Sequence, residues 1–355
     1  MTPRRVGHFL FSIALLVTAE SSMYAQSSPA QPAVTEAEDG YHFQNWQGSP
    51  FNAAYTEWWY FNLYDVKDNI QAIFTYQVAD PLNLTGEGGG DMTVVVYQGN
   101  NVIPESDLYP LSSFTASPTA ANVTLGSNTI SVAGPNTYLV TGATMDGVLS
   151  WNLHYDRVAP SWFAGIRMNV APAKWEQMSW LLYMPRADVY GTLTINGQVY
   201  NIECSGYHDH NWGQWNFESV VWNWAQYSQP NLTFDLGDFV GNPNGRASVD
   251  IGGNRTVFTA NQYSLVHTKW AFDPLDNVQY PIQSVFTASD GDVSVDLVMN
   301  VQQTQPLPTG PPPSLVIYEQ TARYTGTVTV QSQRIAIPVS GDAFKEYTAI
   351  SSAAP

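Results

Sequence analysis

An alternation of apolar and polar residues with a period of two constrains this chain more than any other feature. The pattern is clear over residues 70–78 and recurs in short segments separated by Gly, Pro and Asn. It places successive side chains on opposite faces of a β-strand. Asn196-Gly197 stands between two such segments, which strongly indicates a hairpin. Helix signals are scarce, and residues 173–179 are the only modest candidate. The sequence therefore predicts an antiparallel all-β fold with little helix.

The chain is too long for one β-barrel. A total of 355 residues exceeds what a single barrel usually uses, so we expect two sheet units. The segment richest in chemically active side chains ends near residue 213, and a new set of strands begins near Trp222. This change places a domain boundary around residue 215, with one barrel over 36–215 and a second over 216–350.

The N-terminus has the anatomy of an export signal. Arg4 and Arg5 precede a short apolar run, and small or polar residues follow it. The run is too short to span a bilayer as a helix, so residues 1–25 are predicted to be a cleaved signal peptide. No later stretch approaches the roughly 18 apolar residues of a membrane span. We expect a secreted or periplasmic protein, in which the single Cys204 excludes an intramolecular disulfide.

Charge and aromatic content narrow the choice of partner. The formal net charge of −17 repels phosphate backbones, so nucleic-acid binding is disfavoured. Only 12% of the residues are charged, whereas 13% are aromatic. Large β-sheet cores also use many aromatic residues. The alternative is a cavity that accepts flat or apolar molecules, and an apolar small molecule is therefore the expected partner.

The segment Gly206-Tyr-His-Asp-His-Asn-Trp-Gly213 carries the most informative side chains. The alternation in residues 200–204 continues into it, so His208, His210 and Trp212 are predicted to lie on the inner face of the strand. Asp209 then points to the other side. Because an inner face is shielded from water, these two imidazoles and the indole cannot be explained as a solvent-exposed polar patch.

Three interpretations of these histidines remain open, and all of them assume that the strand keeps its pairing register through the motif. A bulge at Gly206 would exchange the two faces. The histidines could form a hydrogen-bonded structural cluster. The His208-x-His210 pair could chelate a metal ion, although no third ligand stands at a telling spacing. They could also act in acid–base catalysis, because the ordinary pKa of histidine lies near neutrality.

Carboxylates on inner faces are the next candidates. Glu57 shares a face with Trp59, where burial would raise the pKa of its carboxyl; alternatively, it bonds backbone or Arg groups at a strand start. Asp238 continues an inward series of apolar residues, but it could equally be a turn former. Glu319 and Glu346 are later candidates with weaker context.

The order of several motifs resembles one known group. The chain is similar to the lipocalin-like superfamily that includes carotenoid 1,2-hydratase, AttH-type proteins, fungal kievitone hydratase and several fungal Diels–Alderases. The resemblance covers nearly the whole mature chain and is carried by Thr56-Glu-Trp-Trp-Tyr-Phe61, Tyr207-His-Asp-His-Asn-Trp-Gly213, Trp222-Asn-Trp224, Tyr318-Glu319 and the segment 341–347.

The resemblance implies two packed lipocalin-like β-barrels with an apolar substrate between or within them. Carried over residue by residue, the working groups of the carotenoid hydratases fall on His210, Trp212 and Asp238. Leu236 stands near the position of the family's Tyr and cannot donate a proton, which argues against carotenoid hydration. A secreted enzyme similar to kievitone hydratase fits better. The expected substrate-binding side chains are Trp212, Trp59, Tyr207 and Trp224, and the expected catalytic groups are His210, Asp238, His208 and Glu57.

The resemblance also suggests a mechanism. Asp238 or His210 would protonate an alkene such as a prenyl double bond, and aromatic rings would stabilise the tertiary cation. The other acid–base group would then deprotonate the attacking water, with no metal or organic cofactor. Two alternatives use the same kind of cavity: a pericyclase or cyclase that orients a folded polyene, and a non-catalytic carrier of hydrophobic ligands.

Overall fold

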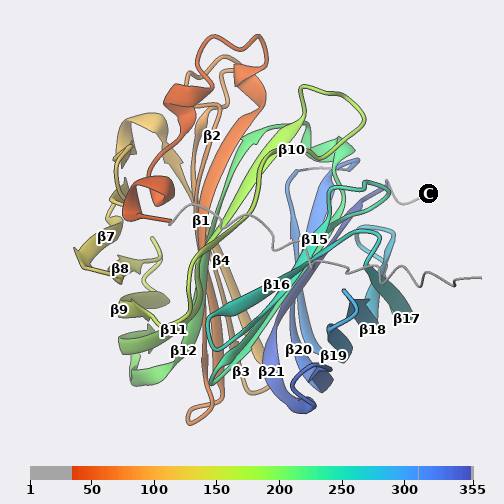
Figure 1. The fold of residues 1–355 in the computed structure, drawn as a ribbon. Coiled ribbons are helices and arrows are strands. Elements are labelled where there is room, and N and C mark those ends of the chain that lie inside the picture. Colours follow the sequence, from red (N-terminus) through yellow and green to blue (C-terminus); the bar gives the residue numbers. More distant parts are fainter. Residues whose placement is uncertain (1–33, 311, 353–355) are drawn as a thin grey trace, which may run out of the picture. The chain divides into compact units, whose positions relative to one another are not determined.

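Strands dominate the part of the chain that the structure describes. The computed structural model covers residues 34–310 and 312–352, so the predicted signal peptide lies outside it (Figure 1). These residues contain no α-helix. Helical structure is limited to short 3-10 turns at Glu36–Asp39 (η1), Phe43–Asn45 (η2), Asn52–Ala54 (η3), Leu111–Ser113 (η4) and Phe217–Ser219 (η5). The predicted all-β class is confirmed.

The first sheet is antiparallel and uses the N-terminal strands. Its order is β4-β3-β2-β1-β12-β11-β9-β8-β7-β6-β5, and β10 pairs with β11. The strands are β1 (Tyr55–Asp65), β2 (Ile70–Ala79), β3 (Gly89–Gln98), β4 (Asn101–Pro110), β5 (Phe114–Ala116), β6 (Val123–Leu125), β7 (Asn128–Gly134), β8 (Thr137–Ala143), β9 (Leu149–Arg157), β10 (Trp162–Asn169), β11 (Gln177–Ile195) and β12 (Gln198–Gln214).

The second sheet is also antiparallel and uses the remaining strands. Its order is β16-β15-β14-β13-β21-β20-β19-β18-β17. The strands are β13 (Trp222–Gln229), β14 (Leu232–Phe239), β15 (Arg246–Ile251), β16 (Asn254–Thr259), β17 (Tyr263–Asp273), β18 (Val278–Ser289), β19 (Val293–Pro308), β20 (Leu315–Val330) and β21 (Ile335–Ile350).

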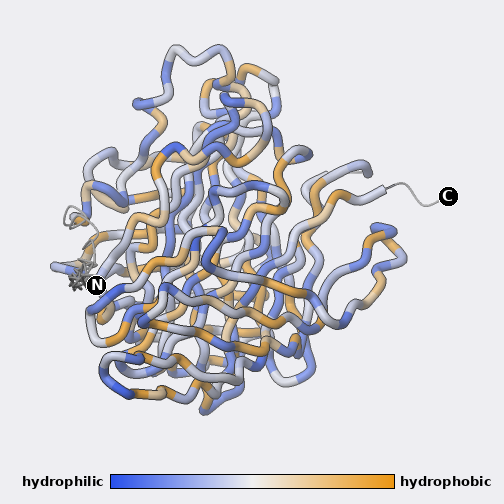
Figure 2. Tube along the Cα trace, turned by 45° about the vertical axis from the view of Figure 1, so that its right-hand side comes forward, coloured by the Kyte–Doolittle hydropathy of each residue, from blue (hydrophilic) through white to orange (hydrophobic). Residues whose placement is uncertain are grey.

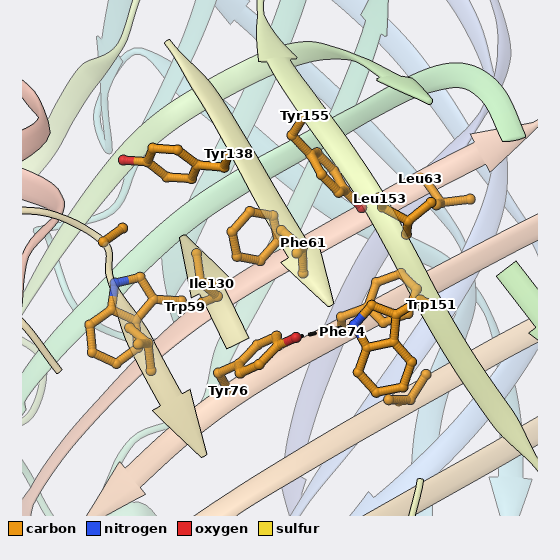
Figure 3. Close-up of a cluster of buried hydrophobic side chains, with 14 of the residues drawn as sticks. Trp59, Phe61, Leu63, Phe74, Tyr76, Ile130, Tyr138, Trp151, Leu153 and Tyr155 are labelled. Atoms are coloured by element: carbon orange, nitrogen blue, oxygen red, sulfur yellow. Dashed lines mark hydrogen bonds between the residues drawn. The ribbon is translucent and has the colours of Figure 1, made fainter. Parts of the chain in front are cut away.

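Each sheet curves around a core of its own. Side chains from distant strands of the first sheet, such as Val94 on β3 and Leu125 on β6, pack in one cluster with Trp59 and Trp151, so this sheet is a nearly closed barrel. Figure 3 shows part of that cluster, including the 3.1 Å hydrogen bond from Trp151 Nε1 to Tyr76 Oη. The second sheet encloses a separate core. We call the two interiors the first and second barrel cores, and the pair of curved sheets confirms the predicted architecture.

Local turn chemistry explains the best-predicted element. Asn196 and Gly197 have φ values of 51° and 78°, and Ile195 pairs directly with Gln198 across the turn. Positive φ at both positions is what a two-residue hairpin of this type requires. The modest helix prediction for residues 173–179 is wrong, because its last three residues already belong to β11 and pair with β12. Figure 2 shows hydrophobic and hydrophilic residues interspersed along the whole trace.

The sheets also contact each other through their outer faces. Tyr60, Trp180 and Tyr207 of the first sheet form one buried cluster with Trp224 and Phe344 of the second. The described residues belong to one compact unit, so the proposed domain boundary near residue 215 stays a prediction. The chain passes from the first sheet to the second between β12 and β13. No helix among the described residues is long and apolar enough to cross a membrane.

Candidate functional site

Strand β12 separates two groups of polar side chains. It pairs with β1 without a register shift, with His208 opposite Phe61, His210 opposite Trp59 and Trp212 opposite Glu57. No bulge at Gly206 interrupts this pairing. The irregularity that does occur lies on the other side of β12, between Leu182 and Ala187 of β11. The alternation predicted from the sequence therefore holds through the motif.

The even-numbered side chains of β12 point into the first barrel core. His210 is fully buried and stacks on Trp59, with ring centroids 4.4 Å apart. Its Nε2 lies 2.9 Å from Glu57 Oε1 and its Nδ1 lies 3.1 Å from Asp39 Oδ1. Burial alone would lower the pKa of His210, but the two carboxylates outweigh it and raise that pKa.

His208 lies deeper in the same core. Its Nδ1 is 2.9 Å from the carbonyl oxygen of Tyr60, and its Nε2 is 2.9 Å from Asp39 Oδ2. The carbonyl oxygen of Tyr60 can only accept, so Nδ1 donates to it. Tyr138 also donates to Asp39 Oδ2, at 2.7 Å. Burial would raise the pKa of Asp39, but the two histidines hold it well below its usual range.

Glu57 lies where the cluster meets the segment before β1. It accepts hydrogen bonds from the Tyr55 hydroxyl and, at 2.9 Å, from the His42 backbone N–H. The His42 Nδ1 lies 3.3 Å from Glu57 Oε1. Burial raises the pKa of Glu57, but hydrogen bonds from His210 and His42 outweigh it and lower that pKa. The predicted raised pKa is therefore wrong, since the sequence did not show these two partners of the carboxylate.

A cavity opens at the mouth of the first barrel. Its wall includes His42, Trp212 and Arg167, and its empty volume, part of it open to solvent, is about 730 Å³. The imidazole of His42 stacks on Trp212, with centroids 3.7 Å apart and planes 4° apart. This pair lies between the mouth cavity and the buried His210. The predicted ligand-binding residues Trp212 and Trp59 both belong to this side of β12.

The odd-numbered side chains of β12 point to the opposite side. A narrow cavity between the two sheets has an empty volume of about 520 Å³, part of it open to solvent. We call it the inter-sheet cavity. Its wall is largely aromatic and carries two carboxyl groups. The rings are those of Trp58, Tyr60, Trp180, Trp215, Trp222, Trp224 and Phe239, and the carboxyls belong to Asp209 and Glu346.

Asp209 is held in place by donors on its own sheet. Its Oδ2 accepts from Trp180 Nε1 at 2.7 Å and from the Tyr207 hydroxyl at 2.8 Å, and its Oδ1 accepts from Asn211 at 3.1 Å. Burial raises the pKa of Asp209 to about 6 in spite of these bonds. Asp209 was predicted to point away from the histidines, and it does.

Glu346 belongs to a pair of carboxyl groups on adjacent strands. Glu319 on β20 is directly opposite Glu346 on β21; Glu319 is buried and Glu346 is half-buried. The indole Nε1 of Trp222 donates to Glu346 Oε2 at 2.9 Å. Burial raises the pKa of Glu346 to about 7, and burial together with its neighbour's charge raises that of Glu319 well above its usual range. Such a pair retains a proton near neutral pH because two carboxylates cannot both ionise there.

The structure does not bring Asp238 to His210. The apolar residues that precede Asp238 on alternate positions, including Phe234 and Leu236, belong to the second barrel core. Asp238 itself accepts from the Tyr263 hydroxyl at 2.8 Å and from Asn223 at 3.1 Å. His210 faces the first barrel core, so two layers of backbone separate the groups. A single chamber that contains His210, Trp212 and Asp238 is therefore excluded.

Two members of the histidine cluster were not predicted. Asp39 and His42 lie in the irregular segment before β1, where no periodicity assigns a face. Tyr207 and Trp224, predicted to bind substrate, lie together on the inter-sheet side with their ring centroids 5.5 Å apart. Trp224 lines the inter-sheet cavity, and Tyr207 positions Asp209 beside it.

Comparisons with known proteins place the fold. No family model matches the chain, and no curated protein matches its sequence. Solved structures do match. A protein of Nitrosomonas europaea assigned as AttH superposes with a TM-score of 0.68 at 14% identity, covering 91% of this chain and 98% of the other. Kievitone hydratase from Nectria haematococca gives 0.63 at 16% identity, covering 91% and 94%. CghA gives 0.53 at 11% identity, covering 84% and 89%. The resemblance seen in the motifs is confirmed as a likeness of fold.

Proposed function

We propose that this chain is a secreted hydratase that adds water to a carbon–carbon double bond of an apolar small molecule in the inter-sheet cavity. One observation carries the proposal: the carboxyl pair Glu319–Glu346 retains a proton beside a wall of aromatic rings. The likeness of fold to kievitone hydratase supports the same reaction class.

Glu346, which lines the cavity, is the acid that protonates the alkene. Its carboxylic acid transfers a proton to the less substituted carbon of a prenyl-type alkene, which leaves a tertiary cation on the neighbouring carbon. The faces of Trp180, Trp222 and Trp224 are available to that cation in the cavity wall. Each well-placed ring contributes about 0.5–2 kcal/mol of cation–π stabilisation. No Lys or Arg is among the described residues that line the cavity, so none of them repels the cation.

The water step falls to Asp209. Its carboxylate takes a proton from the water that attacks the cation, so the product is a tertiary alcohol. Asp209 then releases this proton to solvent and the Glu346 carboxylate takes one up, which restores both groups with no net change in protons. The bonds from Trp180 and Tyr207 fix the carboxylate against the cavity. No step passes through His210 or Asp238, because neither lines this cavity.

Replacement of Glu346 tests the proposal. The purified chain is incubated with a panel of prenylated phenols in ¹⁸O-labelled water, and hydrated products are identified by mass spectrometry. Glu346→Gln retains an acceptor for Trp222 but cannot deliver the proton, and we expect hydration to fall by about 10²–10⁴-fold. Glu203→Gln, an exposed change on β12, is the matched control.

Three results would contradict this proposal. Full turnover in Glu346→Gln would show that Glu346 is not the acid. Cyclised product without label would favour a cyclase in the same cavity. Quenching of Trp fluorescence by ligands that are recovered unchanged would favour a carrier.

A further inference from the structure

Three nitrogens converge on one oxygen in the first barrel core. Glu57 Oε1 lies 2.9 Å from the backbone nitrogen of His42, 3.3 Å from His42 Nδ1 and 2.9 Å from His210 Nε2. A carboxylate oxygen offers two lone pairs, and the backbone N–H occupies one of them. His42 Nδ1 and His210 Nε2 therefore both face the second lone pair of Glu57 Oε1. The three ligand atoms lie within 4.8 Å of one another.

We propose that His42, Glu57 and His210 form a site for one divalent ion of the zinc type. Two imidazoles and one carboxylate are a donor set that zinc uses when it keeps a fourth position for water or substrate. Tetrahedral ligands at zinc distances lie about 3.4 Å from one another, so the observed spacings need only small side-chain movements. The ion takes the place of the proton between His210 Nε2 and Glu57.

The surrounding groups are arranged as such a site requires. Asp39 Oδ1 lies 3.1 Å from His210 Nδ1, and its negative charge favours a proton at that nitrogen, with Nε2 as the ligand atom. Carboxylates commonly orient metal-binding histidines in this manner. The Tyr55 hydroxyl and the His42 N–H hold Glu57. His208 is not a ligand, because Tyr60 and Asp39 occupy its two nitrogens. The ligands proposed here are therefore His42, Glu57 and His210, and not the pair His208 and His210 considered from the sequence.

An ion can reach this site from one side. The side chain of His42 is 14% exposed, whereas that of Glu57 is fully enclosed. His42 and Trp212 both line the mouth cavity, so that cavity is the route of entry and the direction of the fourth position. The site is independent of the proposed hydration, because it lies on the opposite face of β12 from Asp209 and Glu346.

Titration of the full chain with Zn²⁺ tests the proposal. The protein is prepared without an affinity tag, treated with EDTA and dialysed, then titrated calorimetrically in two buffers of different ionisation enthalpy. We expect one Zn²⁺ per chain and net proton release, because the ion displaces a proton from His210. Co²⁺ should give visible d–d absorption typical of four- or five-coordinate nitrogen and oxygen ligands.

Matched variants separate a built site from adventitious binding. His42→Phe retains the stack on Trp212 but removes Nδ1, and we expect at least a tenfold loss of Zn²⁺ affinity with the melting temperature of the metal-free chain nearly unchanged. Glu57→Gln should weaken binding as well. His154→Ala, which changes a half-buried histidine stacked on Tyr190, should bind as the parent does.

Either of two results overturns the proposal: no saturable Zn²⁺ binding to the parent chain, or equal binding by the parent and His42→Phe. Glu346→Gln should bind Zn²⁺ normally while losing hydration. Failure of one proposal is therefore distinguishable from failure of the other.

Discussion

At the scale of single residues, the surroundings of each carboxyl group decide its chemistry. Glu57 is buried but faces two imidazoles, and its pKa is lowered. Glu346 is half-buried, and desolvation together with the negative charge of Asp209 raises its pKa to about 7. Desolvation raises the pKa of both carboxyls, and only at Glu57 do hydrogen bonds from imidazoles outweigh it. Glu57 is thus suited to binding cations, and Glu346 to holding a proton.

The pH dependence of hydration follows from this difference. Glu346 acts as an acid only while protonated, so kcat/KM should fall as the pH rises through about 7. Glu319→Leu removes a hydrogen bond that lowers the pKa of Glu346, which should move the falling limb to higher pH. Glu203→Gln should leave the profile in place. A limb that does not move in Glu319→Leu would show that Glu319 does not influence the titration of Glu346.

Alternation along a strand predicted which residues share a face, but it did not predict their partners. His208, His210 and Trp212 were assigned to the inside of the first barrel, and they lie there. Asp39 and His42 come from an irregular segment, whose fold depends on tertiary contacts. Glu319 and Glu346 are far apart in sequence, and only the pairing of β20 with β21 joins them.

At the scale of elements, the packing around β12 depends on a small residue at Gly206. A Cβ atom there would lie 2.5 Å from the backbone oxygen of Asn62 and 2.5 Å from Val189 Cγ2. At residue 206, therefore, the neighbouring strands β1 and β11 leave no room for a Cβ atom on β12. From the sequence, a bulge at this glycine would have exchanged the two faces of the strand; its pairing with β1 is regular, and the register shifts occur in the pairing with β11.

Substitution of this glycine should destabilise the fold. Because backbone atoms would have to move, Gly206→Ala should lower the free energy of unfolding by about 1–3 kcal/mol. Gly134→Ala is the control, since its new Cβ would meet only Thr137 Cβ at 3.9 Å. Urea denaturation followed by Trp fluorescence measures both changes. Equal midpoints for the two variants would show that β12 can shift to accommodate the methyl group.

At the scale of the whole molecule, the chain combines strong negative charge with buried carboxyl groups. The net charge is −17, and burial raises the pKa of both Asp235 and Glu346 to about 7. The paired sheets could be predicted because alternation recurs along most of the chain. The inter-sheet cavity could not, because it depends on how the outer faces of two separately predicted sheets meet.

These groups predict maximum stability at mildly acidic pH. Between about pH 4 and pH 7 the folded chain binds more protons at Asp235 and Glu346 than the unfolded chain does, so stability falls as the pH rises. His267, whose pKa burial lowers to about 4, acts in the opposite direction, as does His42, whose pKa burial also lowers. We expect the melting temperature to be several degrees higher at pH 5 than at pH 7. A higher value at pH 7 would show that the two carboxyls are ionised without cost in the folded state.

Strand β12 separates two sites: one of its faces carries His208 and His210 in the first barrel core, and the other carries Asp209 in the wall of the inter-sheet cavity. A substitution on one face can tune its own chamber without altering the side chains of the other. An insertion or deletion of one residue cannot, because it would turn Asp209 inward and His210 outward in the same step. Variation in this chain should therefore proceed by exchange of side chains along β12 and never by a change in its length.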